Sequence, residues 1–173
     1  IFTSLYIQDS GKVNLNGNHA MLLENDYLYE DKTGLDNIKL YGLYFGYEPK
    51  NYQKYSDLLQ ITDDLNRNVS TYSKGMKRKL SLLIIVLINR EIIFLDEATS
   101  GVDPISRVEI RKLINLLKDE GKTIVITSHD LAEIEKVACK VTMIRSGKLI
   151  FTKDINETQG ESLEDLFIEE GLK

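Results

Sequence analysis

The sequence has little cysteine, little proline and no long apolar run. Its one cysteine, Cys139, cannot form an internal disulfide, which excludes a disulfide scaffold and fits a reducing compartment. The longest apolar stretch, Leu82 to Ile88, is far shorter than the roughly 18 residues that a membrane span needs, so we expect it in a core. Two prolines and no low-complexity linker predict one domain over residues 1–173.

A surplus of basic charge is also missing. The chain carries 22 basic and 27 acidic residues, a net charge of −5, which disfavours nucleic acid as the main partner. Its N-terminus has no basic segment followed by an apolar one, so no signal peptide is predicted. The sequence begins at Ile1 without a methionine, and we expect the natural start to lie elsewhere.

The first part of the chain predicts one short strand and then helices. The turn pairs Ser10-Gly11 and Asn16-Gly17 bound a candidate strand, Lys12 to Leu15. The stretch from Tyr27 to Thr71 is rich in Tyr, Asp, Asn and Lys and shows no strand alternation. We expect this stretch to be mostly helical.

Beyond residue 73, helical patterns alternate with short apolar runs. One helical stripe runs from Leu80 to Leu87 and a second from Ile110 to Leu117, the second helix being opened by Asp103-Pro104. The continuous apolar run at 92–95 is typical of a strand buried on both faces, and residues 123–127 predict a second buried strand. Residues 141–151 predict a hairpin. This alternation predicts an α/β fold with a parallel sheet.

The strongest chemical signal is Asp96-Glu97, two adjacent carboxylates that follow the run Ile92 to Leu95. Open α/β sheets bind their ligands at the carboxyl ends of the strands. One carboxylate there can hold Mg²⁺ and the other can polarise an attacking water. The alternative is a polar strand end that simply faces solvent.

A second signal is Ser128-His129-Asp130, which follows the next predicted strand. This order would place His129 at the same edge of the sheet as Glu97, where an imidazole can hydrogen-bond a transferred phosphoryl group. The alternative is a structural histidine, which is the commoner role of a single histidine.

A third signal is Tyr72-Ser73-Lys74-Gly75-Met76 at the start of a predicted helix. Four cations fall in its first turns: Lys74, Lys77, Arg78 and Lys79. The helix macrodipole disfavours cations there, and an anion bound at the free backbone N–H groups would offset that effect. The alternative is a solvated basic face.

Together and in this order, these segments resemble the ABC-type ATPase family. Tyr72 to Lys77 resembles its signature motif, and Ile92 to Glu97 resembles Walker B with the catalytic glutamate. Ser100 to Asp103 resembles the D-loop, and His129 the switch histidine. The resemblance covers nearly the whole chain. It implies a P-loop NTPase (RecA-like) parallel sheet core with an inserted helical subdomain at roughly residues 25–89.

Two departures from the family pattern stand out. No Gly-x-x-x-x-Gly-Lys-Ser/Thr occurs, because the three Gly-Lys pairs have Tyr6, Leu116 and Thr142 where the earlier glycine belongs. The resemblance places that Walker A loop a few residues before Ile1, so we expect the N-terminal part of the domain to be missing. Glu24 stands where the family has the Q-loop glutamine, and this resembles the bacitracin and lantibiotic self-protection exporters.

The resemblance also implies a function. The parent protein would be the ATP-hydrolysing subunit of a transporter, at the cytoplasmic face of the membrane, energising export of an antibiotic peptide or another compound. Its partners would be a transmembrane permease and a second ATPase subunit in a head-to-tail dimer. The groove that receives the permease would include Tyr27, Leu28 and Tyr29; the alternative is packing within the subdomain. A non-transport ABC ATPase of translation or DNA repair, and a module that does not hydrolyse ATP, remain alternatives.

Individual roles follow from the resemblance by position. The cofactors would be ATP and Mg²⁺, with Asp96 and Glu24 serving the metal, Glu97 activating water and His129 contacting the γ-phosphate. The remaining residues would lie at the nucleotide between the two subunits: Ser73, Lys74 and Gly75 would bind the partner's nucleotide, and Ser100 and Asp103 would couple the two sites.

Overall fold

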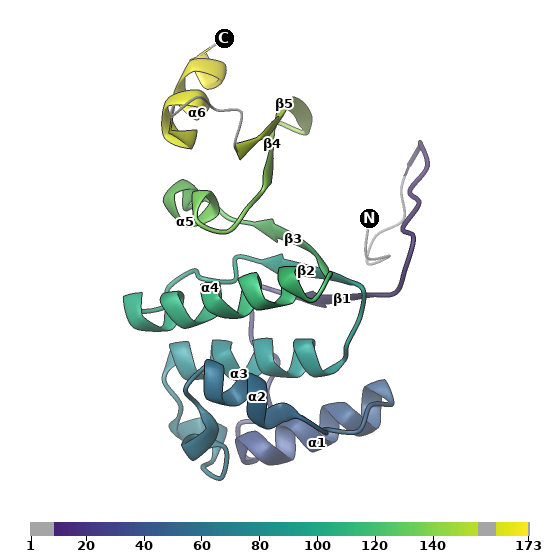
Figure 1. The fold of residues 1–173 in the computed structure, drawn as a ribbon, viewed down its shortest axis with the longest axis vertical. Coiled ribbons are helices and arrows are strands. Elements are labelled where there is room, and N and C mark those ends of the chain that lie inside the picture. Colours follow the sequence, from purple (N-terminus) through teal and green to yellow (C-terminus); the bar gives the residue numbers. More distant parts are fainter. Residues whose placement is uncertain (1–8, 156–161, 173) are drawn as a thin grey trace. The chain divides into compact units, whose positions relative to one another are not determined.

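The computed structural model describes residues 9–155 and 162–172 of the chain. The chain divides into two compact units, Ile1–Thr127 and Ser128–Lys173. The first unit contains β1 (His19–Leu22), α1 (Gly34–Phe45), α2 (Tyr52–Leu58), the 3-10 turns η1 (Thr62–Asp64) and η2 (Val69–Thr71), α3 (Lys74–Leu87), β2 (Ile92–Asp96), α4 (Pro104–Asp119) and β3 (Thr123–Thr127) (Figure 1). The second contains α5 (Leu131–Glu135), β4 (Lys140–Arg145), β5 (Lys148–Asp154) and α6 (Leu163–Leu172).

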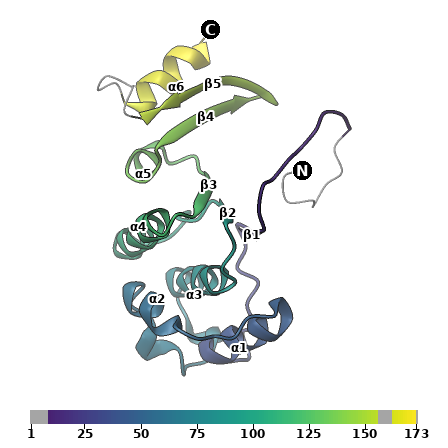
Figure 2. The same cartoon turned by 45° about the vertical axis from the view of Figure 1, so that its right-hand side comes forward.

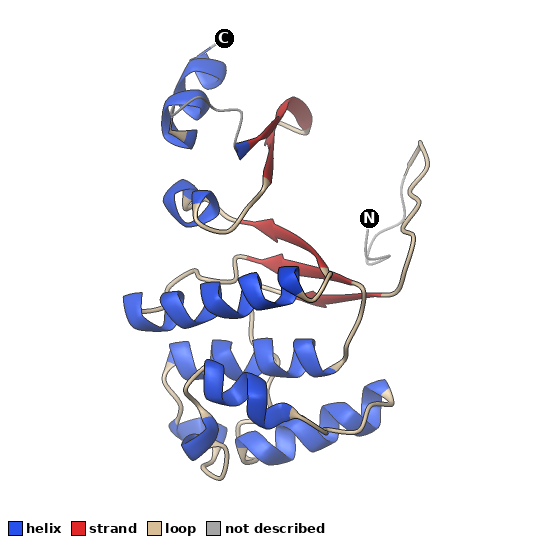
Figure 3. Cartoon of the chain, viewed as in Figure 1, coloured by secondary structure: helices blue, strands red, loops and turns tan. Residues whose placement is uncertain are grey.

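The sheet of the first unit is parallel, with strand order β1-β2-β3. His19 pairs with Ile92, and Ile92 pairs with Thr123, so the three strands run in step to their carboxyl ends. Helices alternate with these strands along the chain, which Figure 3 shows by colour. The predicted α/β fold with a parallel sheet is therefore confirmed.

The first strand does not lie between the two turn pairs, where the sequence predicts it. Residues Lys12 to Leu15 form no strand, and β1 begins at His19 instead. A strand needs a neighbour to satisfy its N–H and C=O groups. The described residues provide such a neighbour, β2, for His19–Leu22, and no ladder includes residues 12–15.

The two predicted buried strands differ in burial. In β2, Ile92, Ile93 and Leu95 are buried, as expected for a central strand. The prediction is wrong for β3, where half-buried residues alternate with exposed ones and Val125 is 43% exposed. A period of two means that one face of the strand is covered, and α4 is a helix that packs against β3.

Helix α3 is the central helix of the first unit. It contacts α1, α2, α4 and β1, and residues 78–88 are all buried. The predicted helix from Leu80 to Leu87 is confirmed. Its buried surface is wider than the predicted apolar stripe, because four neighbouring elements pack around it. Figures 1 and 2 show helices α1–α4 together on one side of the sheet.

The ends of these helices follow the local sequence. Asp103 caps α4 by accepting hydrogen bonds from the backbone N–H groups of Ile105 and Ser106, and Pro104 occupies the first turn. The helix ends before Gly121, whose φ of +81° is in the left-handed region that glycine adopts easily. The start at Asp103-Pro104 agrees with the prediction from the sequence.

Residues 25–89, the predicted helical subdomain, lie wholly in the first unit and contain α1, α2 and α3. The predicted helical content of Tyr27 to Thr71 is confirmed by α1, α2 and two 3-10 turns. Asn37, which is completely buried on α1, joins the preceding loop to this helix by bonding both the N–H and the C=O of Tyr29.

The second unit consists of two helices and an antiparallel hairpin. Strands β4 and β5 pair from Lys140 with Asp154 to Arg145 with Lys148, which confirms the predicted hairpin. Asp130 caps the short helix α5 by accepting from the N–H of Glu133. None of the helices in the described part of the chain is long and apolar enough to cross a bilayer.

Candidate functional site

Asp96 and Glu97 lie at the carboxyl end of β2, as predicted. Asp96 is the last residue of the strand and pairs in register with Thr127, whose hydroxyl donates to the Asp96 carboxylate. Glu97 follows directly, and its backbone N–H donates to the carbonyl of Thr127 at 3.1 Å. Both side chains are only half-buried, so their carboxylates lie at the edge of the sheet rather than in the core.

The backbone of Glu97 has an unusual conformation. Its φ of +49° is in the left-handed region, which side chains with a Cβ atom rarely adopt. Such a conformation costs of order 1–3 kcal/mol and persists only where the surrounding structure holds it. Strained residues of this kind gather at functional sites, which agrees with the chemistry predicted for Glu97.

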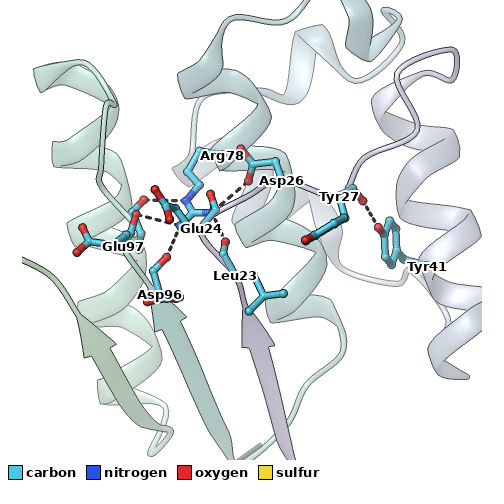
Figure 4. A network of polar contacts seen from close by, with 9 residues as sticks. Leu23, Glu24, Asp26, Tyr27, Tyr41, Arg78, Asp96 and Glu97 are labelled. Atoms are coloured by element: carbon cyan, nitrogen blue, oxygen red, sulfur yellow. Dashed lines mark hydrogen bonds and ion pairs between the residues drawn. The ribbon is translucent and has the colours of Figure 1, made fainter. Parts of the chain in front are cut away.

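Arg78 of α3 holds this strand end in place, a role that no pattern in the sequence predicts. The side chain is 3% exposed, and its Nη2 donates to the carbonyls of Asp96 at 2.6 Å and of Glu97 at 3.0 Å. Its Nε donates to the carbonyl of Ala98 at 3.0 Å. Figure 4 shows the guanidinium between the ends of two strands, surrounded by these oxygens.

The other strand end that Arg78 reaches is that of β1. Its Nη1 donates to the carbonyl of Leu23 at 2.7 Å and to that of Glu24 at 3.3 Å, and it forms a 3.2 Å ion pair with Asp26. Glu24 itself has an exposed side chain. The structure thus brings Glu24, Asp96 and Glu97 to one edge of the sheet, around one buried arginine (Figure 4).

The start of α3 lies against the start of α4. Ser73 caps α3 by accepting from the N–H of Met76 at 3.2 Å. A Cβ atom at Gly75 would lie 2.9 Å from the Asp103 carboxylate and 3.1 Å from the Ser106 hydroxyl. Gly75 therefore permits this close packing, whether or not a phosphate also approaches it.

Three of the four cations at the start of α3 have partners within the protein, and binding of an anion there stays a prediction. Lys77 forms a 2.5 Å ion pair with Glu30, and Lys79 forms a buried ion pair with Glu109. Arg78 is occupied by backbone carbonyls, so protein groups neutralise three of the four charges. Lys74 is exposed, and its amine lies over Gly101.

The residues of the predicted D-loop form a tight turn before α4. The N–H of Ser100 donates to the carbonyl of Glu97 at 3.1 Å, which links the turn to the end of β2. Hydrogen bonds from the backbone N–H and the hydroxyl of Ser106 lower the pKa of Asp103 below its ordinary value. Asp103 is therefore ionised at neutral pH, close to Gly75.

His129 is exposed and belongs to the second unit, two residues beyond the end of β3. Its predicted place beside Glu97 stays a prediction. The neighbouring Asp130 accepts from the N–H of Glu133, and its own N–H donates to the Ser128 hydroxyl, so this segment caps α5.

The carboxylates at this edge of the sheet can be compared with the ligands that Mg²⁺ takes in proteins. Within the described residues, no group of three or more His, Cys, Asp and Glu side chains is placed to hold a metal by itself. Mg²⁺ commonly takes only one or two carboxylates and fills its other positions with water and substrate phosphates. Asp96 and Glu24, at the ends of adjacent strands, fit that limited role.

The buried roles of Arg78 and Lys79 have only a weak signal in the sequence. Arg78 and Lys79 directly precede a helical segment that is apolar almost throughout, which indicates a helix buried on all sides. Charged residues at the start of such a helix are buried with it and need partners. The identity of those partners depends on tertiary contacts with the ends of β1, β2 and α4, which no local pattern predicts.

Comparison with known sequences shows close relatives. A family model described as "AAA domain, putative AbiEii toxin, Type IV TA system" matches residues 8–135. The lantibiotic transport ATP-binding protein SrtF of Streptococcus pyogenes is 31% identical over 176 residues, which is 96% of this chain and 76% of that protein. An uncharacterized ABC transporter ATP-binding protein of Bacillus subtilis, YcbN, is 33% identical over 150 residues, and the match spans 86% of this chain but only 49% of that protein.

Solved structures show the same fold. The ATP-binding subunit of an ABC transporter superposes with a TM-score of 0.78 at 22% identity, covering 88% of this chain and 68% of that one. A metal-chelate type ABC transporter in an inward-facing conformation superposes with a TM-score of 0.80 at 16% identity, over 96% of this chain and 70% of the other. At these identities the likeness establishes the fold.

Proposed function

Because the chain belongs to the family of ABC transporter ATP-binding proteins, we propose that its complete protein binds and hydrolyses ATP to drive transport through a membrane permease. The observation that carries this proposal is the edge of the sheet where Glu24, Asp96 and Glu97 meet around Arg78. Carboxylates at the ends of parallel strands are placed where such sheets bind their ligands.

Glu97 is the proposed general base. Its carboxylate follows β2 directly and is half-buried, and its backbone is held from both sides by Thr127 and Arg78. A carboxylate fixed in this way can orient the water that attacks the γ-phosphate and accept its proton. His129 is the proposed second contact to the γ-phosphate.

Asp96 and Glu24 are the residues that would hold Mg²⁺. When bound, the ion would neutralise charge on the β- and γ-phosphate oxygens. Thr127 donates a hydrogen bond to Asp96 and thereby orients the carboxylate, while leaving it further lone pairs as acceptors.

The nucleotide-binding role of the α3 start is proposed for a head-to-tail dimer. Ser73, Lys74 and Gly75 would contact the nucleotide that the partner subunit holds, because the N-terminus of a helix attracts phosphate. Ser100 and Asp103 lie next to this segment and would couple it to Glu97. Within one subunit, the close approach of Gly75 to Asp103 and the hydrogen bond from the Ser100 N–H to the Glu97 carbonyl support this coupling.

An exposed aromatic patch supports a permease partner. Tyr27 and Tyr29 are 66% and 54% exposed, and Tyr44 on α1 is 83% exposed. Ring contacts join Tyr29 to Tyr41, Tyr41 to Phe45, and Phe45 to Tyr44. Aromatic side chains are enriched at the cores of interfaces. We propose that this patch receives a permease segment. Cross-linking from position 27 or 29 to the co-expressed permease tests this, and absence of a cross-link at both sites with hydrolysis intact would count against it.

The transported compound is proposed from the relative and from Glu24. SrtF is a lantibiotic transport protein by name, and a glutamate at the Q-loop position resembles the exporters that protect bacteria from such peptides. We propose export of an antibiotic peptide or a similar compound, with the ATPase at the cytoplasmic face of the membrane. Growth of cells with and without the complete protein and its permease, in graded concentrations of bacitracin or nisin, would test this.

Substitution of Glu97→Gln in the complete protein tests the central proposal. Turnover should fall by about 10²–10⁴-fold while ATP binding is preserved, because only the proton acceptor is removed. Glu48→Gln is a matched control, since Glu48 is exposed and pairs only with Lys50 among the ion pairs described. Near-normal hydrolysis by the Glu97→Gln protein would remove Glu97 from this role.

A further inference from the structure

Arg78 makes a set of contacts that goes beyond stabilising a helix. Its three nitrogen atoms donate to six oxygens, five of which are backbone carbonyls and one a carboxylate. The guanidinium has five N–H groups in a rigid plane, and this geometry can serve several acceptors at once. Such a buried arrangement fixes the backbone positions of everything that it touches.

Three of the five carbonyls are consecutive and bracket the proposed base. They belong to Asp96, Glu97 and Ala98, at 2.6, 3.0 and 3.0 Å from the nitrogens of Arg78. The backbone at Glu97 is in the left-handed region, with a φ of +49°. A residue in this conformation needs neighbours that hold it, and Arg78 binds the carbonyls before, at and after that residue.

The remaining contacts fix Arg78 itself. Its Nη1 bonds the carbonyls of Leu23 and Glu24 at the end of β1, and it pairs with Asp26 at 3.2 Å. The Asp26 side chain is 13% exposed, so this ion pair is largely sheltered from water. Asp26 thereby orients the guanidinium toward both strand ends (Figure 4).

Arg78 also connects these strand ends to the start of α3. Ser73 caps the helix five residues earlier, and Gly75 packs against Asp103. Arg78 lies in the second turn of α3, so the hydrogen-bonded backbone of one helix connects the α3 start to the guanidinium.

From these contacts we propose that Arg78 is a positioning residue, which acts on catalysis by holding the backbone of Glu97 and Glu24 while Asp26 orients it. The inference rests on the proposed function of Glu97 as general base. It also implies that engagement of the α3 start by the partner subunit is transmitted through Arg78 to the base. Lysine cannot replace it, because a single ammonium group cannot span both strand ends.

The test is Arg78→Lys in the complete protein. The turnover number should fall by about 10- to 100-fold with little change in KM for ATP, because a misplaced base slows the chemical step without removing nucleotide contacts. Arg67→Lys is the matched control. Arg67 is exposed, pairs with Asp64, and among the described residues makes no hydrogen bond or ion pair with the ends of β1 or β2. Wild-type turnover by Arg78→Lys would overturn the proposal.

A double-mutant cycle separates positioning from general stability. If Arg78 acts through Glu97, Arg78→Lys should change the single-turnover rate by less than about twofold in a Glu97→Gln background. Fully additive losses would show that Arg78 acts independently of the base and would overturn the proposal. If Arg78→Lys does not fold, Asp26→Asn retains the arginine and should still lower turnover; a folded Asp26→Asn protein with wild-type turnover contradicts the role.

Amide hydrogen exchange gives a readout that needs no hydrolysis. The N–H groups of Glu97 and Ser100 are bonded to the carbonyls of Thr127 and Glu97, respectively. Both should exchange at least about tenfold faster in Arg78→Lys, because local opening controls exchange. A wild-type protein without ATPase activity would refute the proposed function alone, whereas unchanged exchange at both amides would refute the positioning role alone.

Discussion

At the residue scale, Gly75 shows how one position can satisfy packing and chemistry together. The sequence predicts it as a close approach for phosphate, in a motif that opens a helix. The structure shows that any side chain there would press on the Asp103 carboxylate and the Ser106 hydroxyl, at 2.9 and 3.1 Å from the Cβ position. A glycine at this position is therefore explained by the protein alone, and binding to a partner's nucleotide stays a prediction.

Tyr72, next to Ser73, gives a prediction about pH. Burial, aided by the nearby charge of Asp64, raises the pKa of Tyr72 to about 12, and its hydroxyl donates to the carbonyl of Asp64 at 2.6 Å. Because the folded-state pKa lies above the unfolded value near 10, the stabilisation is complete below pH 10 and is lost as the pH rises toward 12. By pH 11 Tyr72 alone should lower the free energy of unfolding by about 1 kcal/mol.

Urea unfolding at several pH values between 9 and about 11.5 would measure this effect. Tyr72→Phe should be less stable at neutral pH by about 1 kcal/mol, through loss of the hydrogen bond, and should show a shallower decline above pH 10. Burial also raises the pKa of Tyr47 to about 12, so the wild-type decline includes a second contribution. An unchanged slope in Tyr72→Phe would contradict the assignment.

At the scale of elements, α3 shows which part of a helix a sequence predicts. Apolar spacing predicted the helix from Leu80 to Leu87, and the Ser73 cap fits its beginning. Spacing did not predict that the charged residues 77–79 are each bound by groups of the protein, because their partners come from the loop after β1, the strand ends and α4. Contacts of this kind depend on the packing of elements that are distant in the sequence.

The ion pair between Lys79 and Glu109 joins α3 to α4 and gives a second prediction. Both side chains are buried, at 8% and 4% exposure. Glu109→Gln should lower the free energy of unfolding by about 3–5 kcal/mol, because it leaves a buried ammonium without its counter-charge. Denaturant unfolding followed by circular dichroism measures this loss.

Two further proteins test the cause of that loss. The double substitution Lys79→Met with Glu109→Leu should recover most of the stability, since an apolar pair of similar volume avoids the unpaired charge. Glu120→Gln is the control at an exposed site, where Glu120 pairs with Lys54 at 2.6 Å, and it should cost less than about 1 kcal/mol. Equal losses for Glu109→Gln and Glu120→Gln would show that burial does not matter here.

At the scale of the whole molecule, the sequence predicted the class of fold and the edge of the sheet that carries the carboxylates. The apolar runs before Asp96 and after Gly121 were sufficient, because strands that pair in parallel bring their carboxyl ends together. The sequence-based prediction of the first strand was wrong. Residues Lys12 to Leu15 alternate like a strand, but no strand ladder in the described part of the chain includes them. Strand pairing is a property of the assembled sheet, and local alternation cannot establish it.

The last prediction concerns the 173-residue chain produced by itself. ATP affinity in P-loop proteins comes largely from backbone N–H groups and a lysine around the phosphates, and these residues contain no Gly-x-x-x-x-Gly-Lys-Ser/Thr. Near the proposed phosphate position lie Glu24, Asp96 and Glu97, whose like charge repels a polyanion. The nearby Arg78 does not offset them, because backbone carbonyls and Asp26 occupy its donors.

We therefore expect the isolated chain neither to bind MgATP measurably nor to hydrolyse it. Among the described residues, β1 and β3 each pair only with β2, and such open strand edges favour self-association. Calorimetric titration with MgATP, with light scattering to follow the oligomeric state, is the measurement. The control is the complete protein, which should bind MgATP under the same conditions. Saturable micromolar binding by the monomeric 173-residue chain would show that residues other than a P-loop hold the nucleotide.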